Sequence, residues 1–165
     1  MRELFPFLRT AVSATTRPMR PGEHDGREYH FLTDEDFLAH VDMGDFLEHV
    51  VYAGNRYGTL RQEVDGHLRN GDSVILEIEL RGARALRQAL PDAVTIFIEP
   101  PSRDELIRRL RARATEAEAD IQARLAESLV ELDARQEFNY QVRNDDLDTA
   151  TAEMARIVDA VTRSV

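Results

Sequence analysis

Apolar segments alternate with helical periodicities along the whole chain, and this order restricts the fold more than any other feature. Helical spacing is clear where apolar residues recur every four positions, as at Leu60, Val64 and Leu68. The segments expected to be strands are 8–14, 73–80, 93–99 and 138–144. Strands separated by helices predict an α/β fold with a parallel sheet and flanking helices.

Capping signals mark where several of the helices should begin. A Ser or Thr is followed by an acidic residue three positions later at Thr33 with Asp36, Ser102 with Glu105, and Thr115 with Glu118. Such pairs are typical of capping boxes. One insertion, about 30–71, separates the first two strands and carries its own helices and a possible strand at 46–52. Because linker-like stretches and internal repeats are absent, we expect a single domain over 1–165.

An arginine- and proline-rich stretch is the first candidate site. Arg17 and Arg20 lie three apart, next to Pro18 and Pro21, which constrain the backbone. Nearby hydroxyls come from Ser13, Thr15, Thr16 and Tyr29. Guanidinium forks and hydroxyls suit a phosphate group. The alternative is a polar surface loop with two solvated arginines.

Composition excludes several classes of protein. A net charge of −10 argues against a general nucleic-acid surface, and the absence of cysteine excludes disulfides and thiolate metal sites. No apolar run approaches the ~20 residues that span a bilayer, and no signal-peptide pattern occurs. We therefore expect a cytoplasmic protein without nucleic acid or membrane as partner. The five histidines show no metal-ligand spacing, so we expect no metal site on the protein.

Residues 13–23, Ser-Ala-Thr-Thr-Arg-Pro-Met-Arg-Pro-Gly-Glu, are similar to the loop of guanylate kinases that binds the nucleotide monophosphate. Six further motifs fall in that family's order and spacing, at 26–31, 44–48, 54–59, 76–78, 100–102 and 144–147. The resemblance covers essentially the whole chain. It implies a P-loop kinase type of fold, with a GMP-binding lobe at about 30–71 and a helical lid at about 103–125.

The resemblance assigns the guanine site to Glu48, with Ser13 and Thr59 as hydroxyls. Guanine carries N1–H and N2–H₂ donors beside the O6 acceptor, so a carboxylate matches the donors and a hydroxyl matches O6. Without the neighbouring motifs, the alternative interpretation of Glu48 is a solvated acid at the start of a strand. In this assignment AMP is rejected because adenine leaves the carboxylate unpaired.

The phosphate and the remaining acids complete the implied GMP site. The resemblance places Arg17, Arg20, Tyr29 and Tyr57 on the phosphate. Glu77 and Glu79 lie two apart, so we expect them on one strand face near its C-terminal end, where ligands bind in open α/β sheets. The family associates these two positions with the guanine site and the hydration shell of Mg²⁺. At the position of Glu79 the family usually has aspartate, and at the position of Arg81 it usually has glutamine.

The resemblance assigns fewer residues to the site that binds ATP, the phosphate donor. Arg109, Arg113 and Arg124 match lid arginines that clamp ATP phosphates during transfer, and Arg113 and Asn144 match ATP-binding positions. Mg²⁺ is implied as the cofactor that accompanies ATP. Alanines stand at 112 and 114, where the family has glycines, and this change should stiffen the lid. The alternative for these arginines is a solvated helix face.

The printed sequence contains no lysine and no Gly-x-x-x-x-Gly-Lys run, the phosphate-binding loop of this family. The family's central strand precedes that loop, so three alternatives remain: the sheet closes up, a partner fills the gap, or the sequence is a fragment of a longer protein. The isolated chain is therefore expected to be either poorly stable or self-associated. The expected function is guanylate kinase, phosphorylating GMP to GDP with ATP, in a truncated or impaired form. The alternative is a non-catalytic GMP-, phospho-ligand- or protein-binding module.

Overall fold

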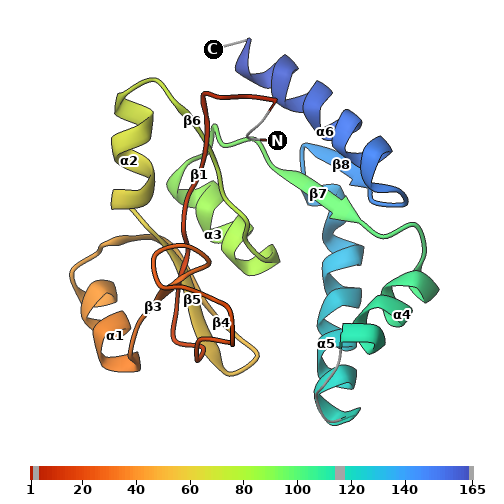
Figure 1. Cartoon of the computed structure of the whole chain (residues 1–165), viewed down its shortest axis with the longest axis horizontal. Coiled ribbons are helices and arrows are strands. Elements are labelled where there is room, and N and C mark those ends of the chain that lie inside the picture. Colours follow the sequence, from red (N-terminus) through yellow and green to blue (C-terminus); the bar gives the residue numbers. More distant parts are fainter. Residues whose placement is uncertain (2–3, 114–117, 164–165) are drawn as a thin grey trace. The chain divides into compact units, whose positions relative to one another are not determined.

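The computed structural model of the chain describes residues 1, 4–113 and 118–163. Of the helical residues 112–113, 118–121 and 123–124 it describes the backbone alone. The chain forms two compact units, Met1–Ala93 and Val94–Val165 (Figure 1). The expected lobe at about 30–71 lies in the first unit, and the expected lid at about 103–125 lies in the second.

The first unit contains two sheets and three helices. Its elements are β1 (Leu8–Thr10), β2 (Ala14–Thr15), β3 (His30–Phe31), α1 (Asp34–Asp42), β4 (Phe46–Tyr52), β5 (Asn55–Leu60), α2 (Gln62–Arg69), β6 (Ser73–Ile75) and α3 (Leu80–Ala89). β1 and β6 form a parallel pair, and the larger sheet has the order β3-β2-β5-β4. In the larger sheet β4 and β5 are an antiparallel hairpin, and β2 lies beside β5.

A bulge in β4 divides the core of this unit. The register with β5 shifts between Phe46 and Glu48, so Phe46, Leu47 and Glu48 are all buried instead of alternating. Phe46 stacks on Phe37 of α1, with ring centroids 4.4 Å apart. Leu47 joins a second cluster with Ala11, Val64 and Leu86. The bulge therefore leaves Glu48 buried beside two apolar clusters.

The predicted caps are confirmed where they lie in the described part. The Thr33 hydroxyl accepts from the backbone N–H of Asp36 at 3.0 Å, and α1 ends before Gly44, whose φ is +72°. At the start of α4 the Ser102 hydroxyl accepts from Glu105 N–H at 3.2 Å. Thr115, expected to cap the next helix, lies outside the described residues.

The second unit consists of a parallel strand pair and helices. Its elements are β7 (Ile96–Glu99), α4 (Arg103–Arg113), α5 (Glu118–Asp133), the 3₁₀ turn η1 (Ala134–Glu137), β8 (Tyr140–Arg143) and α6 (Leu147–Thr162). β7 and β8 pair in register from Ile96 with Tyr140 to Glu99 with Arg143. Although β7 was expected to be a buried strand, Ile98 is 53% exposed.

Two strand predictions are wrong in their limits. The strand expected at 73–80 ends at Ile75, and helix α3 already begins at Leu80. Its partner β1 ends at Thr10, because the chain then turns away toward β2, so residues beyond Ile75 lack a neighbouring strand. For the same reason the strand expected at 8–14 is split into β1 and β2.

The fold class is confirmed, and the expected parallel strands form two separate pairs. β1 pairs with β6 and β7 pairs with β8, and among the described residues no ladder joins one pair to the other. The described helices flank these strands, as an α/β fold requires. No helix in the described part is long and apolar enough to cross a membrane.

Candidate functional site

A buried carboxylate lies at the centre of the candidate site. Glu48 is only 5% exposed, and its Oε1 accepts a hydrogen bond from the Thr59 hydroxyl on β5 at 2.8 Å. Helix α3 approaches its other oxygen, because a Cβ added at Gly82 would lie 2.8 Å from Glu48 Oε2. The carboxylate is therefore held from two sides by neighbouring elements.

Burial changes the protonation of this carboxylate. Desolvation raises the pKa of Glu48 above its ordinary value, and the nearby charge of Glu79 raises it further. The hydrogen bonds from Thr59 act in the opposite direction and favour the ionised form. A ligand with two adjacent N–H donors would favour the ionised form in the same way. The Glu48 carboxylate is therefore suited to bind such a pair of donors.

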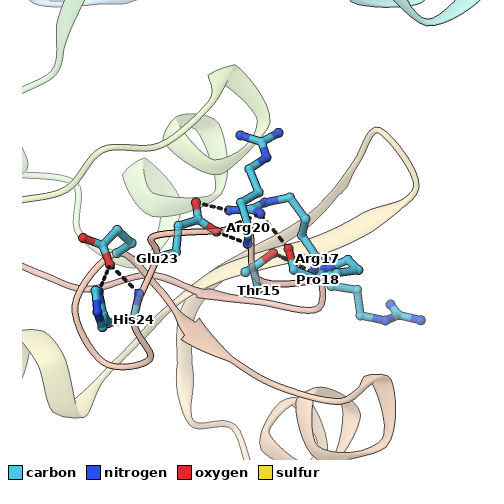
Figure 2. Close-up of polar contacts among 8 residues, drawn as sticks. Thr15, Arg17, Pro18, Arg20, Glu23 and His24 are labelled. Carbon is cyan, nitrogen blue, oxygen red and sulfur yellow. Dashed lines mark hydrogen bonds and ion pairs between the residues drawn. The ribbon is translucent and has the colours of Figure 1, made fainter. Parts of the chain in front are cut away.

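The arginine-rich loop forms a second cluster, shown in Figure 2. Arg17 donates to both oxygens of Glu23, from Nη1 at 3.1 Å and from Nη2 at 2.8 Å. Its guanidinium lies over the rings of Tyr29 and Phe31, at 5.3 and 5.6 Å from their centroids. The Arg17 side chain is 13% exposed, so this cation is held in place and is not a solvated surface group.

Two tyrosines connect this loop to the hairpin. The rings of Tyr29 and Tyr57 are 6.0 Å apart, edge to face, and Tyr57 lies on β5, opposite Thr15 of β2. Burial raises the pKa of Tyr29, so its hydroxyl stays protonated at neutral pH and can donate a hydrogen bond. The charge of Glu79 contributes to the raised pKa of both Tyr29 and Glu48, so Glu79 lies near both groups.

The structure therefore brings most of the expected GMP-binding residues into one region of the first unit. The region includes Arg17, Tyr29, Glu48, Tyr57, Thr59 and Glu79. Ser13 adjoins it just before β2 and is half-buried, whereas Arg20 is exposed. The expectation that Glu77 and Glu79 share a strand face is wrong. Both follow the end of β6, where Glu77 is exposed and Glu79 is the half-buried N-cap of α3.

In the second unit the structure brings Arg109 and Asn144 together. Arg109 Nη1 donates to the backbone oxygen of Asn144 at 3.1 Å, and its Nε donates to Glu105 at 2.6 Å. Hydrogen bonds from Arg108 and Arg109 lower the pKa of Glu105 to about 2. Arg113 and Arg124 lie on α4 and α5, but their side chains are outside the described residues.

Sequence reasoning missed two residues of this region. Glu23 belongs to the arginine-rich motif, and an acid six positions after Arg17 beyond a Pro-Gly turn is a signal for the pairing. Gly82 interrupts a helical pattern, and an isolated helical glycine often marks a close approach of another group. The contact of Gly82 joins it to Glu48, which is distant in sequence, so spacing alone did not predict it.

The donor atoms for a metal ion are limited. Among the described residues no group of three or more His, Asp or Glu side chains is placed to hold a metal ion. The histidines instead contact acids, as in His30 with Glu63 at 2.9 Å and His40 with Asp45 at 2.8 Å.

Comparison with known proteins identifies relatives over nearly the whole chain. The family model for guanylate kinase matches residues 5–161. A guanylate kinase of Rubrobacter xylanophilus is 51% identical over 153 residues, which cover 93% of this chain and 80% of the relative. One from Synechococcus sp. strain JA-3-3Ab is 48% identical over 158 residues, or 96% of this chain and 73% of the relative.

A solved structure agrees with these sequence relatives. The crystal structure of guanylate kinase from Anaplasma phagocytophilum superimposes with a TM-score of 0.79 and 30% identity. The alignment covers 99% of this chain and 78% of that one. The similarity therefore extends through both units, including the hairpin that carries Glu48.

Proposed function

The chain belongs to the guanylate kinase family. We propose that it binds GMP in the first unit and transfers a phosphoryl group from ATP to the bound GMP. The observation that carries this proposal is the buried Glu48 carboxylate. Burying an ionisable carboxylate destabilises the fold unless hydrogen-bond donors face it. The buried position of Glu48 therefore points to a ligand that supplies such donors. Guanine supplies two donors on a single edge.

The hydrogen bonds of the site refine the expected contacts to guanine. Glu48 accepts N1–H and N2–H₂ of the base. The Thr59 hydroxyl has one hydrogen, which it gives to Glu48 at 2.8 Å, so it cannot donate to O6 at the same time. Ser13 is therefore the better donor to O6, and Thr59 serves to hold the carboxylate in place.

The phosphate of GMP binds at the arginine loop. Arg17 and Arg20 supply positive charge, and the hydroxyls of Tyr29 and Tyr57 complete the set of donors. Tyr29 suits this role because burial keeps its pKa raised and its hydroxyl protonated. These four groups orient the acceptor oxygen for attack, and in phosphoryl transfer such positioning supplies much of the catalysis.

The ATP side belongs to the second unit in this proposal. Arg109 and Asn144, which contact one another, bind the donor nucleotide together with Arg113, and Arg124 contributes charge to the phosphates. Mg²⁺ bound to the ATP phosphates would supply positive charge beside the transferred group. The cytoplasm is the proposed location, as for an enzyme acting on free nucleotides.

Phosphoryl transfer tests the proposal directly. The chain is incubated with ATP, Mg²⁺ and either GMP or AMP, and ADP and the diphosphate product are quantified against a blank without protein. We expect GDP and ADP in equal amounts with GMP, little product with AMP, and loss of product in Arg17→Ala. If GMP binds but no GDP forms above the blank, the chain is a binding module and not a kinase.

A further inference from the structure

Glu23 contacts the arginine loop through both of its carboxylate oxygens. Its Oε1 accepts from Arg17 Nη2 at 2.8 Å, and its Oε2 accepts from Arg17 Nη1 at 3.1 Å. The same Oε2 accepts from the backbone N–H of Arg20 at 2.7 Å (Figure 2). One carboxylate therefore fixes the side chain of the first arginine and the backbone of the second.

The donors of Arg17 can be counted. A guanidinium has five N–H hydrogens: one on Nε and two on each Nη. Glu23 takes one hydrogen from each Nη, and the backbone oxygen of Pro18 takes the other from Nη1 at 2.7 Å. In the described part of the chain no acceptor takes the Nε hydrogen or the second hydrogen of Nη2.

These two remaining hydrogens lie side by side on one edge of the guanidinium. Such an edge binds two oxygens of a phosphate at once. The rest of the group is restrained, because Arg17 Cζ lies over the rings of Tyr29 and Phe31, at 5.3 and 5.6 Å from their centroids. The backbone N–H of Arg17 also donates to the Thr15 hydroxyl at 3.1 Å. The free edge is therefore presented in a fixed direction.

We propose that Glu23 is a positioning residue of the GMP site, which holds Arg17 by its outer edge so that the Nε–Nη2 edge is available to the substrate phosphate. The inference rests on the proposed function. The phosphate joins Arg17 without displacing Glu23, and the guanidinium is then shared between two anions. The hydrogen bonds from Arg17 and from Arg20 N–H keep the pKa of Glu23 below its ordinary value, so it stays ionised.

The opposite role is an inhibitory one, in which Glu23 occupies the place of the phosphate and must leave before GMP binds. The two roles predict opposite effects of Glu23→Gln. The amide cannot accept from both Nη groups, so a positioning role predicts weaker GMP binding. An inhibitory role predicts tighter binding, because the competing charge is gone.

The test is calorimetric titration of GMP and guanosine into the full chain and its variants. The matched control is Glu35→Gln, an exposed acid in the first turn of α1 in the same unit. We expect Glu23→Gln to weaken GMP about tenfold and to leave guanosine unchanged, since only the phosphate meets Arg17. In an Arg17→Ala background the same substitution should weaken GMP by much less.

Each other outcome is decisive. Tighter GMP binding would overturn the inference in favour of the inhibitory role, and an unchanged affinity would overturn it outright. Equal losses for GMP and guanosine would show that Glu23 only maintains the fold. If the unmutated chain binds GMP and guanosine equally, the proposed phosphate site itself is refuted, and this inference with it.

Discussion

Replacing Glu48 by glutamine should separate recognition of guanine from stability of the fold. Glutamine keeps the shape of the side chain and can still accept the Thr59 hydrogen bond at Oε1. Its amide group, however, places a donor where GMP also presents one. Because hydrogen bonds to a charged group contribute ~1.5–3 kcal/mol, GMP binding should weaken by about 1–3 kcal/mol.

Inosine monophosphate sharpens this experiment, since it lacks the 2-amino group and offers the carboxylate one donor fewer. The unmutated chain should prefer GMP over inosine monophosphate by roughly 10- to 100-fold, which corresponds to one charge-assisted bond. In Glu48→Gln that preference should nearly vanish. Titration calorimetry with both nucleotides gives the ratio, and Glu35→Gln serves as the control with the same change of charge.

The same substitution should make the fold more stable at neutral pH. The pKa of Glu48 is raised in the folded state, so the folded chain binds this proton more tightly than the unfolded chain does. The resulting stability is present below the unfolded pKa and is lost as pH rises through the folded pKa. Glu48→Gln cannot ionise, so in urea unfolding its stability relative to the unmutated chain should increase as pH rises from the unfolded pKa of Glu48 through its raised folded pKa.

GMP affinity should show the matching dependence on pH. Guanine requires the ionised carboxylate, so GMP binding to the unmutated chain should weaken as pH falls through the raised pKa of Glu48. In Glu48→Gln only the dependence that comes from the GMP phosphate, whose second pKa is about 6, should remain. The reasoning is refuted if the variant keeps the full preference for GMP over inosine monophosphate, or if it is less stable than the unmutated chain at pH 8.

Three further predictions concern helix α3, the arginine loop and the turn between β4 and β5. Gly82→Ala should give no net stabilisation in urea unfolding, because the gain in helix propensity of about 1 kcal/mol is offset by the crowding of the new Cβ against the buried Glu48 side chain. It should weaken GMP binding about tenfold in calorimetry, since the new Cβ would lie 2.8 Å from Glu48 Oε2; unchanged binding would exclude that approach. Arg20→Ala should weaken GMP about tenfold but not guanosine, and equal effects would exclude a phosphate contact. Ala53→Asn should raise the free energy of unfolding by about 0.5–1 kcal/mol without changing GMP affinity, because Ala53 has a φ of +46° in the hairpin turn; a loss of stability would contradict this.

Features set by local interactions were predicted correctly from the sequence. The cap at Thr33 depends on a hydrogen bond three residues away, and the end of α1 depends on the conformational freedom of Gly44. The strand limits were less predictable, since they depend on partners. Residues 76–79 alternate like a strand, and Leu76 and Ile78 pack against the core, but no neighbouring strand extends beyond Ile75 to pair with them.

In the candidate site, too, some features were predictable from the sequence and others depended on the folded structure. Arg17, Tyr29 and Tyr57 were found because their motif identifies them, and they do cluster. The burial of Glu48 was not predictable from its neighbours, because it depends on the bulge in β4 and on the approach of α3. Pairing of Arg17 with Glu23 likewise required the loop to fold back on itself.

The most direct test of the account is the affinity of the unmutated chain for GMP compared with AMP. Adenine lacks both donors that face Glu48, and a buried carboxylate left unpaired penalises the wrong base strongly. Titration calorimetry at a pH above the raised pKa of Glu48, where GMP binding no longer changes with pH, measures both affinities under the same conditions. The account predicts that GMP binds at least ~100-fold more tightly than AMP. Equal affinities would show that Glu48 does not recognise guanine.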